Sequence, residues 1–334
     1  MKALVVGYGY MGEIRLRVTE ALEGIEVAGI ADPHPAAPLP DAYPVFDDWR
    51  EALDRTDPDV VFVCTPNHLI PDIACAALEQ GRHVFCEKPP GRNLADIQRI
   101  CAAEAASPGS KLIFGFNHRH HPSVVDAKAI VDSGAVGRIL VLRGVYGKSG
   151  GSGFEHSWRN DPAVGGGGIL LDQGIHMLDL FRHFCGDFTQ VMGMRQTSHW
   201  DIPMEDNAFV LLRNASGQMA QLHSSATQWK HMFRLEITLE GGYLHIAGLL
   251  SKSGSYGREH LLVGRRSAVS AVGNPSEEIT YYDTDLSWDT EVRHLLDCIR
   301  EDRPVEIGSS TDALRVMEIV ESVYASDPVT TARS

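Results

Sequence analysis

The sequence lacks a long hydrophobic run. Hydrophobic residues make up 43% of the 334 residues, yet no run approaches the roughly 18 to 20 apolar residues that a membrane-spanning helix requires. The N-terminal residues also lack the basic and then apolar pattern of a signal peptide, and they are typical of a strand. We therefore expect a cytoplasmic protein.

Positive charge is scarce as well. Lys and Arg together number 30, against 44 Asp and Glu, which gives a formal net charge of -14. Nonspecific binding to nucleic acid or to anionic lipid depends on clustered basic residues, so this balance argues against both partners. A local basic pocket for an anionic substrate remains compatible with it.

Cysteine is infrequent, and its six copies lack C-x-x-C spacing. Most of them lie inside apolar segments, which indicates reduced thiols in the protein core. They are Cys64, Cys75, Cys86, Cys101, Cys185 and Cys298. A chain of this length exceeds the usual size of one hydrophobic core, so we expect two domains.

What the sequence does contain is a glycine-rich turn near its start. The apolar run of residues 3–6 leads directly into Gly7-Tyr8-Gly9-Tyr10-Met11-Gly12, a G-x-G-x-x-G pattern between an expected strand and an expected helix. In a dinucleotide site, Gly7 allows the tight turn, Gly9 lets the backbone approach a pyrophosphate, and Gly12 brings the helix close to the strand. The helix N-terminus adds N–H groups and partial positive charge. An ordinary loop between strand and helix is the alternative interpretation of this motif alone.

A second apolar strand, residues 25–31, ends in Asp32, about 20 positions beyond the glycines. A carboxylate there accepts hydrogen bonds from the adenosine ribose and would repel the 2′-phosphate of NADP. Pro33 and His34 follow instead of an arginine that could hold that phosphate. NAD is therefore favoured over NADP, and the alternative is an Asp that only caps the turn before Pro33.

Strands and helices alternate over the first 115 residues or so, which predicts a parallel, doubly wound sheet of the α/β class. The expected elements are strands at 60–64, 83–86 and 111–116 and helices at 70–80 and 94–105. Ligands of such sheets bind beyond the carboxyl ends of the strands.

Polar motifs follow three of these strands. They are Thr65-Pro66-Asn67-His68, Glu87-Lys88-Pro89-Pro90 and Asn117-His118-Arg119-His120-His121-Pro122. Convergence of the strand ends would bring Lys88 and Asn117 toward the nicotinamide end of a dinucleotide, where burial and neighbouring charge can tune a lysine. A solvated surface lysine in a proline-rich loop is the alternative.

Further along the chain, four glycines at 165–168 lead into an apolar helical pattern over 169–181. Asp172 and His176 are four residues apart, so in a regular helix their side chains share one face. They form either a self-satisfied buried pair or a base and its orienting group at a cleft.

Together these motifs resemble the glucose–fructose oxidoreductase/inositol dehydrogenase (Gfo/Idh/MocA) family. The residues that carry the resemblance are Gly7 to Gly12, Asp32, Thr65 to His68, Glu87-Lys88-Pro89, Gly115 to Arg119, Trp158-Arg159 and Asp172 to His176. The order of Glu-Lys-Pro and then Asp-x-Gly-x-His after a nucleotide fingerprint is specific to this family.

The resemblance implies a Rossmann domain over residues 1–120 and a substrate-binding and oligomerisation α+β domain over 121–285. The second domain would contain a large, open, mostly antiparallel sheet that mediates a homodimer or homotetramer. Strand-like segments at 139–146, 208–212, 218–225 and 233–239 agree with it. The helical patterns within 286–334 would pack back on the first domain.

The chemistry that the resemblance implies is hydride transfer between NAD and a secondary alcohol or ketone of a sugar, cyclitol or derivative, with nucleotide-activated and phosphorylated sugars included. Alcohol oxidation needs a proton acceptor and a nearby cation for the developing alkoxide. We expect His176 as general base, Lys88 on the reacting oxygen, and Asp172 on a neighbouring hydroxyl; which of Lys88 and His176 takes the proton first stays open.

The expected site residues form two sets. Those for the cofactor are Gly7, Gly9, Tyr10, Met11, Gly12, Asp32, Thr65, Pro66, Asn67, His68, Glu87, Lys88 and Asn117. Those for the substrate are Lys88, Arg119, Trp158, Arg159, Asp172 and His176, since arginines hold anions and an indole stacks on a sugar. Residues 147–156 form either a mobile loop at the cleft or a plain connector. No metal is expected, because the histidines at 118–121 lack ligand spacing.

Two alternative functions are known within the family. One is an NAD-dependent glycosidase that oxidises its sugar transiently, and the other is a non-catalytic NAD- or sugar-sensing regulatory protein. The presence of Lys88, Asp172 and His176 together argues against the regulatory protein.

Overall fold

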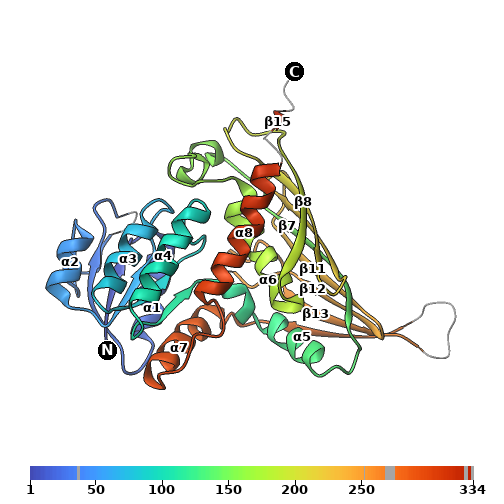
Figure 1. Ribbon diagram of the computed structural model, residues 1–334, viewed down its shortest axis with the longest axis horizontal. Coiled ribbons are helices and arrows are strands. Elements are labelled where there is room, and N and C mark those ends of the chain that lie inside the picture. The colour runs from blue at the N-terminus through green and yellow to red at the C-terminus, as the bar shows by residue number, and fades with distance from the viewer. Residues whose placement is uncertain (36–37, 252, 268–274, 327–329, 332–334) are drawn as a thin grey trace. The chain divides into compact units, whose positions relative to one another are not determined.

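The chain forms two compact units in a computed structural model, which describes residues 1–35, 38–251, 253–267, 275–326 and 330–331. The first unit comprises Met1–Asn117, Ala163–Gly166 and Trp288–Met317. The second comprises His118–Pro162, Gly167–Ser287 and Glu318–Ser334. Figure 1 shows the helices and strands of each unit.

The first unit is built on a six-stranded parallel sheet in the order β3-β2-β1-β4-β5-β6. Its strands are β1 Lys2–Val6, β2 Glu26–Ala31, β3 Val45–Phe46, β4 Val60–Val63, β5 His83–Cys86 and β6 Leu112–Phe114. The central strands are short apolar runs because helices cover both faces of a parallel sheet, and all of β4 is buried. The strand order reverses between β1 and β4, which is where such sheets bind ligands.

Helices α1 Tyr10–Glu20, α2 Trp49–Thr56, α3 Ile70–Glu79 and α4 Leu94–Ala106 connect these strands, and α7 Ser287–Arg300 joins the same unit almost entirely. The α4 helix begins where the Asn93 side chain accepts a hydrogen bond from the backbone of Asp96. Helices α3 and α4 pack side by side (Figure 1). Leu295 and Leu296 of α7 enter the core that contains Val5 and Phe62.

The second unit is built on a nine-stranded sheet in the order β14-β13-β12-β11-β7-β10-β9-β8-β15. Neighbouring strands are antiparallel except β7 with β10 and β8 with β15. The strands are β7 Ile139–Gly147, β8 Phe188–Thr197, β9 Asn207–Asn214, β10 Met219–Ser225, β11 Met232–Leu239, β12 Gly242–Ala247, β13 Glu259–Arg265, β14 Ser276–Tyr282 and β15 Thr330–Thr331. Burial alternates along β9 and β10, as expected for a sheet with one covered face.

Helices α5 Pro122–Asp132 and α6 Ile175–Cys185 belong to this second unit, together with the last part of α8 Ser310–Ser326. The α6 helix approaches the sheet closely at Gly144 on β7. A Cβ atom there would lie 2.5 Å from Cγ of Met177 and 2.9 Å from Cζ of Phe181. Gly144 therefore allows the apolar helix α6 to pack closely against the centre of the sheet.

Two expected elements differ in the structure. The helix expected over 169–181 begins with a π-helical turn, Leu170–Gly174, before the regular α6. Asp172 belongs to this turn, so the face-sharing argument for Asp172 and His176, which assumed 3.6 residues per turn, does not hold. The strand expected over 111–116 is shorter, because Gly115 and Phe116 leave the sheet.

The architecture confirms the expected α/β class, with a doubly wound parallel sheet and a second, large, mostly antiparallel sheet. Among the described residues, no helix is long and apolar enough to cross a membrane.

Candidate active site

The glycine turn after β1 is tight on two sides and open on the third. Gly7 has a φ of +92°, and a Cβ there would lie 2.6 Å from the carbonyl oxygen of Cys64. A Cβ on Gly12 would lie 2.1 Å from the carbonyl oxygen of Gly7, so α1 packs directly on the turn. Around Gly9, which caps α1, no described atom lies within 4 Å of the Cβ position. A phosphate can therefore reach the backbone at Gly9 and the first N–H groups of α1.

The two residues between these glycines lie at the start of α1. Tyr10 is 55% exposed, whereas Met11 is partly buried and packs against the core of the unit. The turn thus presents one aromatic side chain outward and anchors the helix with the next residue.

Asp32 follows β2 and is tied to the glycine turn. Its Oδ2 accepts a hydrogen bond from the backbone N–H of Tyr8 at 2.6 Å, and its Oδ1 accepts one from His34 at 2.7 Å. The second contact is the turn-capping bond of the alternative interpretation. A carboxylate oxygen has two acceptor sites, so these bonds leave Asp32 able to accept from a ribose hydroxyl.

The end of β4 carries polar atoms without partners. Oγ1 of Thr65 and Nδ1 of His68 are buried and have no hydrogen-bond partner among the described residues. Asn67 is different, because its amide donates to the carbonyl of Gly165 at 2.7 Å. Buried polar atoms are nearly always paired, so Thr65 and His68, on either side of Pro66, fit a bound polar ligand. β4 pairs with β1, which brings this edge beside the glycine turn.

Glu87, at the end of β5, faces the interior. Arg15 on α1 is fully buried, and its guanidinium lies 2.6 Å from a carboxylate oxygen of Glu87 and 2.6 Å from one of Glu291 on α7. Burial would lower the pKa of Arg15, but the two carboxylates raise it above its ordinary value. This buried ion pair fixes the strand end that carries the half-buried Lys88.

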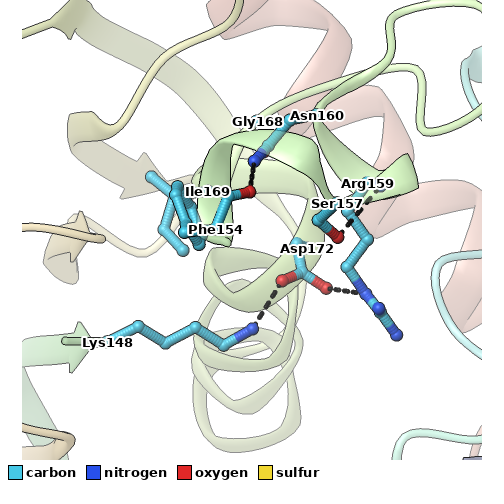
Figure 2. A pocket seen from close by; sticks show the side chains of 8 residues that line it. All are labelled: Lys148, Phe154, Ser157, Arg159, Asn160, Gly168, Ile169 and Asp172. Carbon is cyan, nitrogen blue, oxygen red and sulfur yellow. Dashed lines mark hydrogen bonds and ion pairs between the residues drawn. The ribbon is translucent and has the colours of Figure 1, made fainter. Parts of the chain in front are cut away.

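Asp172 lies between two cations in the second unit. Nζ of Lys148 is 2.7 Å from its Oδ2, and Nε of Arg159 is 3.4 Å from its Oδ1. Figure 2 shows the two side chains approaching the carboxylate from different sides. All three line a pocket of about 110 Å³, together with Phe154, Ser157, Asn160, Gly168 and Ile169. Ligand pockets usually measure about 300 to 1,000 Å³, so this one can hold only a part of a substrate.

His176, in the first turn of α6, is buried and stacks on His118. The ring centroids are 3.8 Å apart and the planes differ by 19°. Nε2 of His118 in turn lies 3.0 Å from the hydroxyl of Tyr146. Burial, followed by the charge and hydrogen bond of Tyr256, raises the pKa of Tyr146 well above 10, so its hydroxyl stays protonated near neutral pH. The imidazole of His176 is thus held by an aromatic array.

The other expected substrate residues have different surroundings. Arg119 is buried and forms a two-point ion pair with Asp179 of α6, at 2.8 and 2.6 Å. This geometry favours a structural contribution of Arg119 within the unit. Trp158 is half-buried, and the guanidinium of Arg159 lies 4.4 Å from its ring centroid. In the 147–156 segment, Phe154 contacts Trp200 at 5.0 Å between centroids.

The expected residues fall into both units. Lys88 and the buried Asn117 belong to the first, while Asp172, His176, Arg119, Trp158 and Arg159 belong to the second. That Lys88 and His176 act on the same substrate therefore stays a prediction.

Four residues of these surroundings were in neither expected set: Arg15, His118, Tyr146 and Lys148. A basic residue between the apolar Ile14 and Leu16 of α1 was a signal that a buried carboxylate partner exists. Lys148 directly follows β7, and Lys88 lies two residues after β5; this position near a strand end was the available signal for Lys148.

Comparison with known proteins matches two segments of the chain to family models. The model of an oxidoreductase family with an NAD-binding Rossmann fold matches residues 1–116. The model of the GFO/IDH/MocA C-terminal domain matches residues 124–245. These matches confirm the resemblance inferred from the motifs, and they confirm NAD as the cofactor of the first domain.

Two of the similar proteins are dehydrogenases by name. Levoglucosan dehydrogenase of Pseudarthrobacter phenanthrenivorans is 34% identical over 172 residues, which are 51% of this chain and 44% of that protein. Inositol 2-dehydrogenase of Salmonella typhimurium is 32% identical over 43% of this chain and 45% of its own length. The matched part thus spans less than half of these relatives.

A solved structure agrees over almost the whole length. Levoglucosan dehydrogenase in complex with NADH and levoglucosan has a TM-score of 0.84 and covers 98% of this chain and 96% of its own. Its sequence identity is 22%, so this similarity establishes the shared fold.

Proposed function

Because the chain belongs to the GFO/IDH/MocA oxidoreductase family, we propose that it is an NAD-dependent dehydrogenase or reductase of a sugar or cyclitol. The reaction would interconvert a secondary alcohol and a ketone. The observation that carries the proposal is the edge formed by the open turn at Gly9 and the unpartnered polar atoms of Thr65 and His68. Buried polar atoms are nearly always paired, so these two atoms fit a ligand that binds at this edge.

The first unit would hold the cofactor through its strand ends. Backbone N–H groups of the glycine turn would bind the pyrophosphate, and Asp32 would accept from the ribose. Thr65 and His68 would supply further polar contacts. NAD, when bound, supplies the hydride acceptor of the oxidation.

The second unit would hold and deprotonate the substrate. His176 accepts the hydroxyl proton as general base, and the stacked ring of His118 fixes the plane of its imidazole. Lys88 of the first unit donates to the reacting oxygen and stabilises its negative charge. Asp172 accepts from a neighbouring hydroxyl, and Trp158 stacks on the sugar ring.

Named relatives support a sugar or cyclitol as substrate, since they act on levoglucosan and inositol by name. The half-exposed guanidinium of Arg159 on Trp158 adds a surface suited to a polar ring compound.

We further propose that the second unit assembles with a second copy of this chain. One face of its sheet exposes apolar side chains, with Met192 69%, Met194 74% and Phe209 47% exposed. Met192 pairs with Leu211 and Met194 with Phe209, so these side chains share one face. A contiguous apolar patch on a sheet is typical of an interface. Met194→Glu should lower the molar mass measured by light scattering, and an unchanged mass would contradict this interface.

The six cysteines are all free thiols, which supports the cytoplasm as the location, because oxidising compartments favour disulfides. Fractionation that recovers the native protein outside the cytoplasm would refute this.

The activity is tested with the purified chain and a panel of levoglucosan, myo-inositol and methyl glucosides. We expect NADH to accumulate in proportion to the substrate oxidised. Cleavage of a glycoside without net NADH would instead identify a redox-assisted glycosidase. Binding of NADH without turnover of any sugar would identify a sensor and contradict the proposal.

A further inference from the structure

The pocket beside Asp172 contains more positive than negative charge. Among its lining residues, Lys148, Arg159 and Asp172 are the charged ones (Figure 2). One carboxylate compensates one of the two cations. The pocket therefore carries one excess positive charge, although the whole chain has a formal net charge of -14.

The excess charge resides on Arg159. Lys148 is 2.7 Å from Asp172, the length of a strong charge-assisted hydrogen bond, whereas Arg159 is 3.4 Å away. The longer contact uses Nε, which leaves the terminal Nη1 and Nη2 to meet another acceptor. The Arg159 side chain is 47% exposed, so a ligand can reach these nitrogens.

The guanidinium of Arg159 is also held in place. Its Cζ lies over the indole of Trp158, 4.4 Å from the ring centroid, which is within the range of a cation–π contact. The backbone N–H of Arg159 donates to Oγ of Ser157 at 3.3 Å, and the side chain of Asn160 donates to the carbonyl of Phe154 at 2.5 Å. These contacts order the short segment that presents the arginine, so little freedom is lost when a ligand binds.

We propose that this pocket binds a carboxylate of the substrate, so that the preferred substrate is an acidic sugar such as a uronate or an aldonate. The proposal rests on the proposed function and specifies its substrate class. Arg159 binds a carboxylate through two parallel N–H bonds, for which its planar fork is suited. Lys148 stays paired with Asp172 beside it, so the carboxylate of the substrate meets the charge of Arg159.

Charge and size favour a carboxylate over a phosphate. A carboxylate carries one negative charge, which equals the excess in the pocket. A phosphate monoester carries about 1.5 to 2 negative charges near neutral pH, which would leave negative charge uncompensated beside Asp172. The pocket volume of about 110 Å³ suits a small substituent, with the sugar ring outside it.

The test is calorimetric titration of the chain saturated with NADH. The acidic ligands are D-glucuronate, D-galacturonate and D-gluconate, and their neutral counterparts are D-glucose and D-galactose. D-Glucose 6-phosphate is the phosphorylated ligand for comparison. We expect at least one acid to bind about tenfold or more tightly than its neutral counterpart, as one charge-assisted interaction supplies.

Variants locate the interaction. Arg159→Gln should weaken binding of the preferred acid roughly 10- to 100-fold, and at least several times more than it weakens the neutral sugar. Arg159→Lys keeps the charge but loses the fork and should restore a part of the affinity. Arg138→Gln is the matched control, because Arg138 is 65% exposed, pairs with Glu240 and lies outside the pocket lining.

Each outcome decides one proposal. Neutral sugars that bind as tightly as every acid, or equal effects of Arg159→Gln on both, would overturn the acidic substrate. Tighter binding of glucose 6-phosphate than of every acid would overturn the choice of carboxylate. Turnover of neutral sugars without binding of any acid would leave the proposed function standing and remove this inference. Binding of an acid without turnover of any sugar would support the acid-binding pocket and contradict the proposed function.

Discussion

Replacement of Gly9 with Ala should weaken NAD binding while leaving the fold intact. A Cβ at this position meets no described atom within 4 Å, and the backbone there is extended, with φ -91° and ψ -162°. Any residue adopts that conformation, and such Gly-to-Ala changes commonly leave stability unchanged or raise it. The same methyl group would stand where the pyrophosphate has to approach the turn.

The size of the effect follows from the bonds that the methyl group blocks. A hydrogen bond from a backbone N–H to a charged phosphate contributes about 1.5 to 3 kcal/mol. Loss of one such bond raises the Kd for NADH roughly 10- to 100-fold. Gly12→Ala behaves differently, because its Cβ would lie 2.1 Å from the carbonyl oxygen of Gly7, a backbone atom that cannot move aside alone. Overpacking of this kind costs about 1 to 3 kcal/mol.

The two variants are compared by fluorescence titration with NADH and by thermal unfolding. Gly109→Ala is the control, since no described atom lies within 4 Å of its Cβ position and it belongs to no expected site. Gly9→Ala should keep the melting temperature of the control and lose affinity, while Gly12→Ala should lose melting temperature as well. A Kd for Gly9→Ala within twofold of wild type would refute the placement of the pyrophosphate.

Three further predictions concern catalysis, cofactor choice and acid stability. Lys88→Ala should lower kcat about 100-fold or more, because a positioned cation or acid–base group typically contributes that much; a kcat within twofold of wild type would exclude the assigned role. Asp32→Ala combined with Pro33→Arg should raise kcat/KM for NADP relative to NAD, since the carboxylate that repels the 2′-phosphate is removed and a cation is added; an unchanged ratio would remove Asp32 from the adenosine site. Burial would raise the pKa of Glu259, but hydrogen bonds from His121, Ser123 and Leu250 outweigh burial and lower it from 4.5 to about 2. The stability from this shift, roughly 3 kcal/mol, is therefore present above about pH 4.5 and is lost as pH falls toward 2. Glu259→Gln should accordingly be less stable than wild type in urea unfolding at neutral pH, with the difference shrinking below about pH 4; a constant difference would contradict the reasoning.

Much of the first unit could be predicted from the sequence because its strands are continuous apolar runs. The strand expected at 83–86 has the same bounds in the structure, and the helix expected at 70–80 is α3, Ile70–Glu79. Buried parallel strands and the helices between them can be predicted from local sequence, because the strands are apolar throughout and glycine often follows a helix end. The short β3 and the helix α2 carry weaker signals and were not predicted individually.

The second unit was harder to predict because β8 and β14 lack a clearly buried face. β8 exposes Met192 and Met194, so its pattern of apolar residues does not mark a buried face. The strands β12 to β14 were not predicted, and most of β14 is exposed. The sequence does not distinguish an apolar residue on an uncovered face of the sheet from one in the core, whereas the folded structure does.

The π-helical turn at Leu170–Gly174 shows a similar limit within the site. The sequence indicated a helix there, and a helix with an acid and a histidine four residues apart. The extra residue in the turn depends on what surrounds it: Gly174 meets the side chain of Ser224 on β10, where a Cβ would lie 3.0 Å from Oγ. The side chain that such a turn presents is therefore set by packing across the sheet rather than by spacing along the chain.

For the candidate site too, the sequence indicates which residue types are present, whereas only the structure shows their interaction partners. The role of each residue type could be inferred, since an acid at a strand end, or a lysine between a strand end and two prolines, has few functions. The partners come from elsewhere: Asp172 pairs with Lys148, 24 residues away, and Glu87 with Arg15, 72 residues away. Whether Asp172 is a free acceptor for a hydroxyl or one member of a charged cluster depends entirely on Lys148 and Arg159. Two cations meet one carboxylate there, so the aspartate that suggested binding of a neutral sugar belongs to a cationic pocket. The charge of the preferred substrate is therefore the property that most directly distinguishes a pocket for a neutral sugar from a pocket for an acidic one.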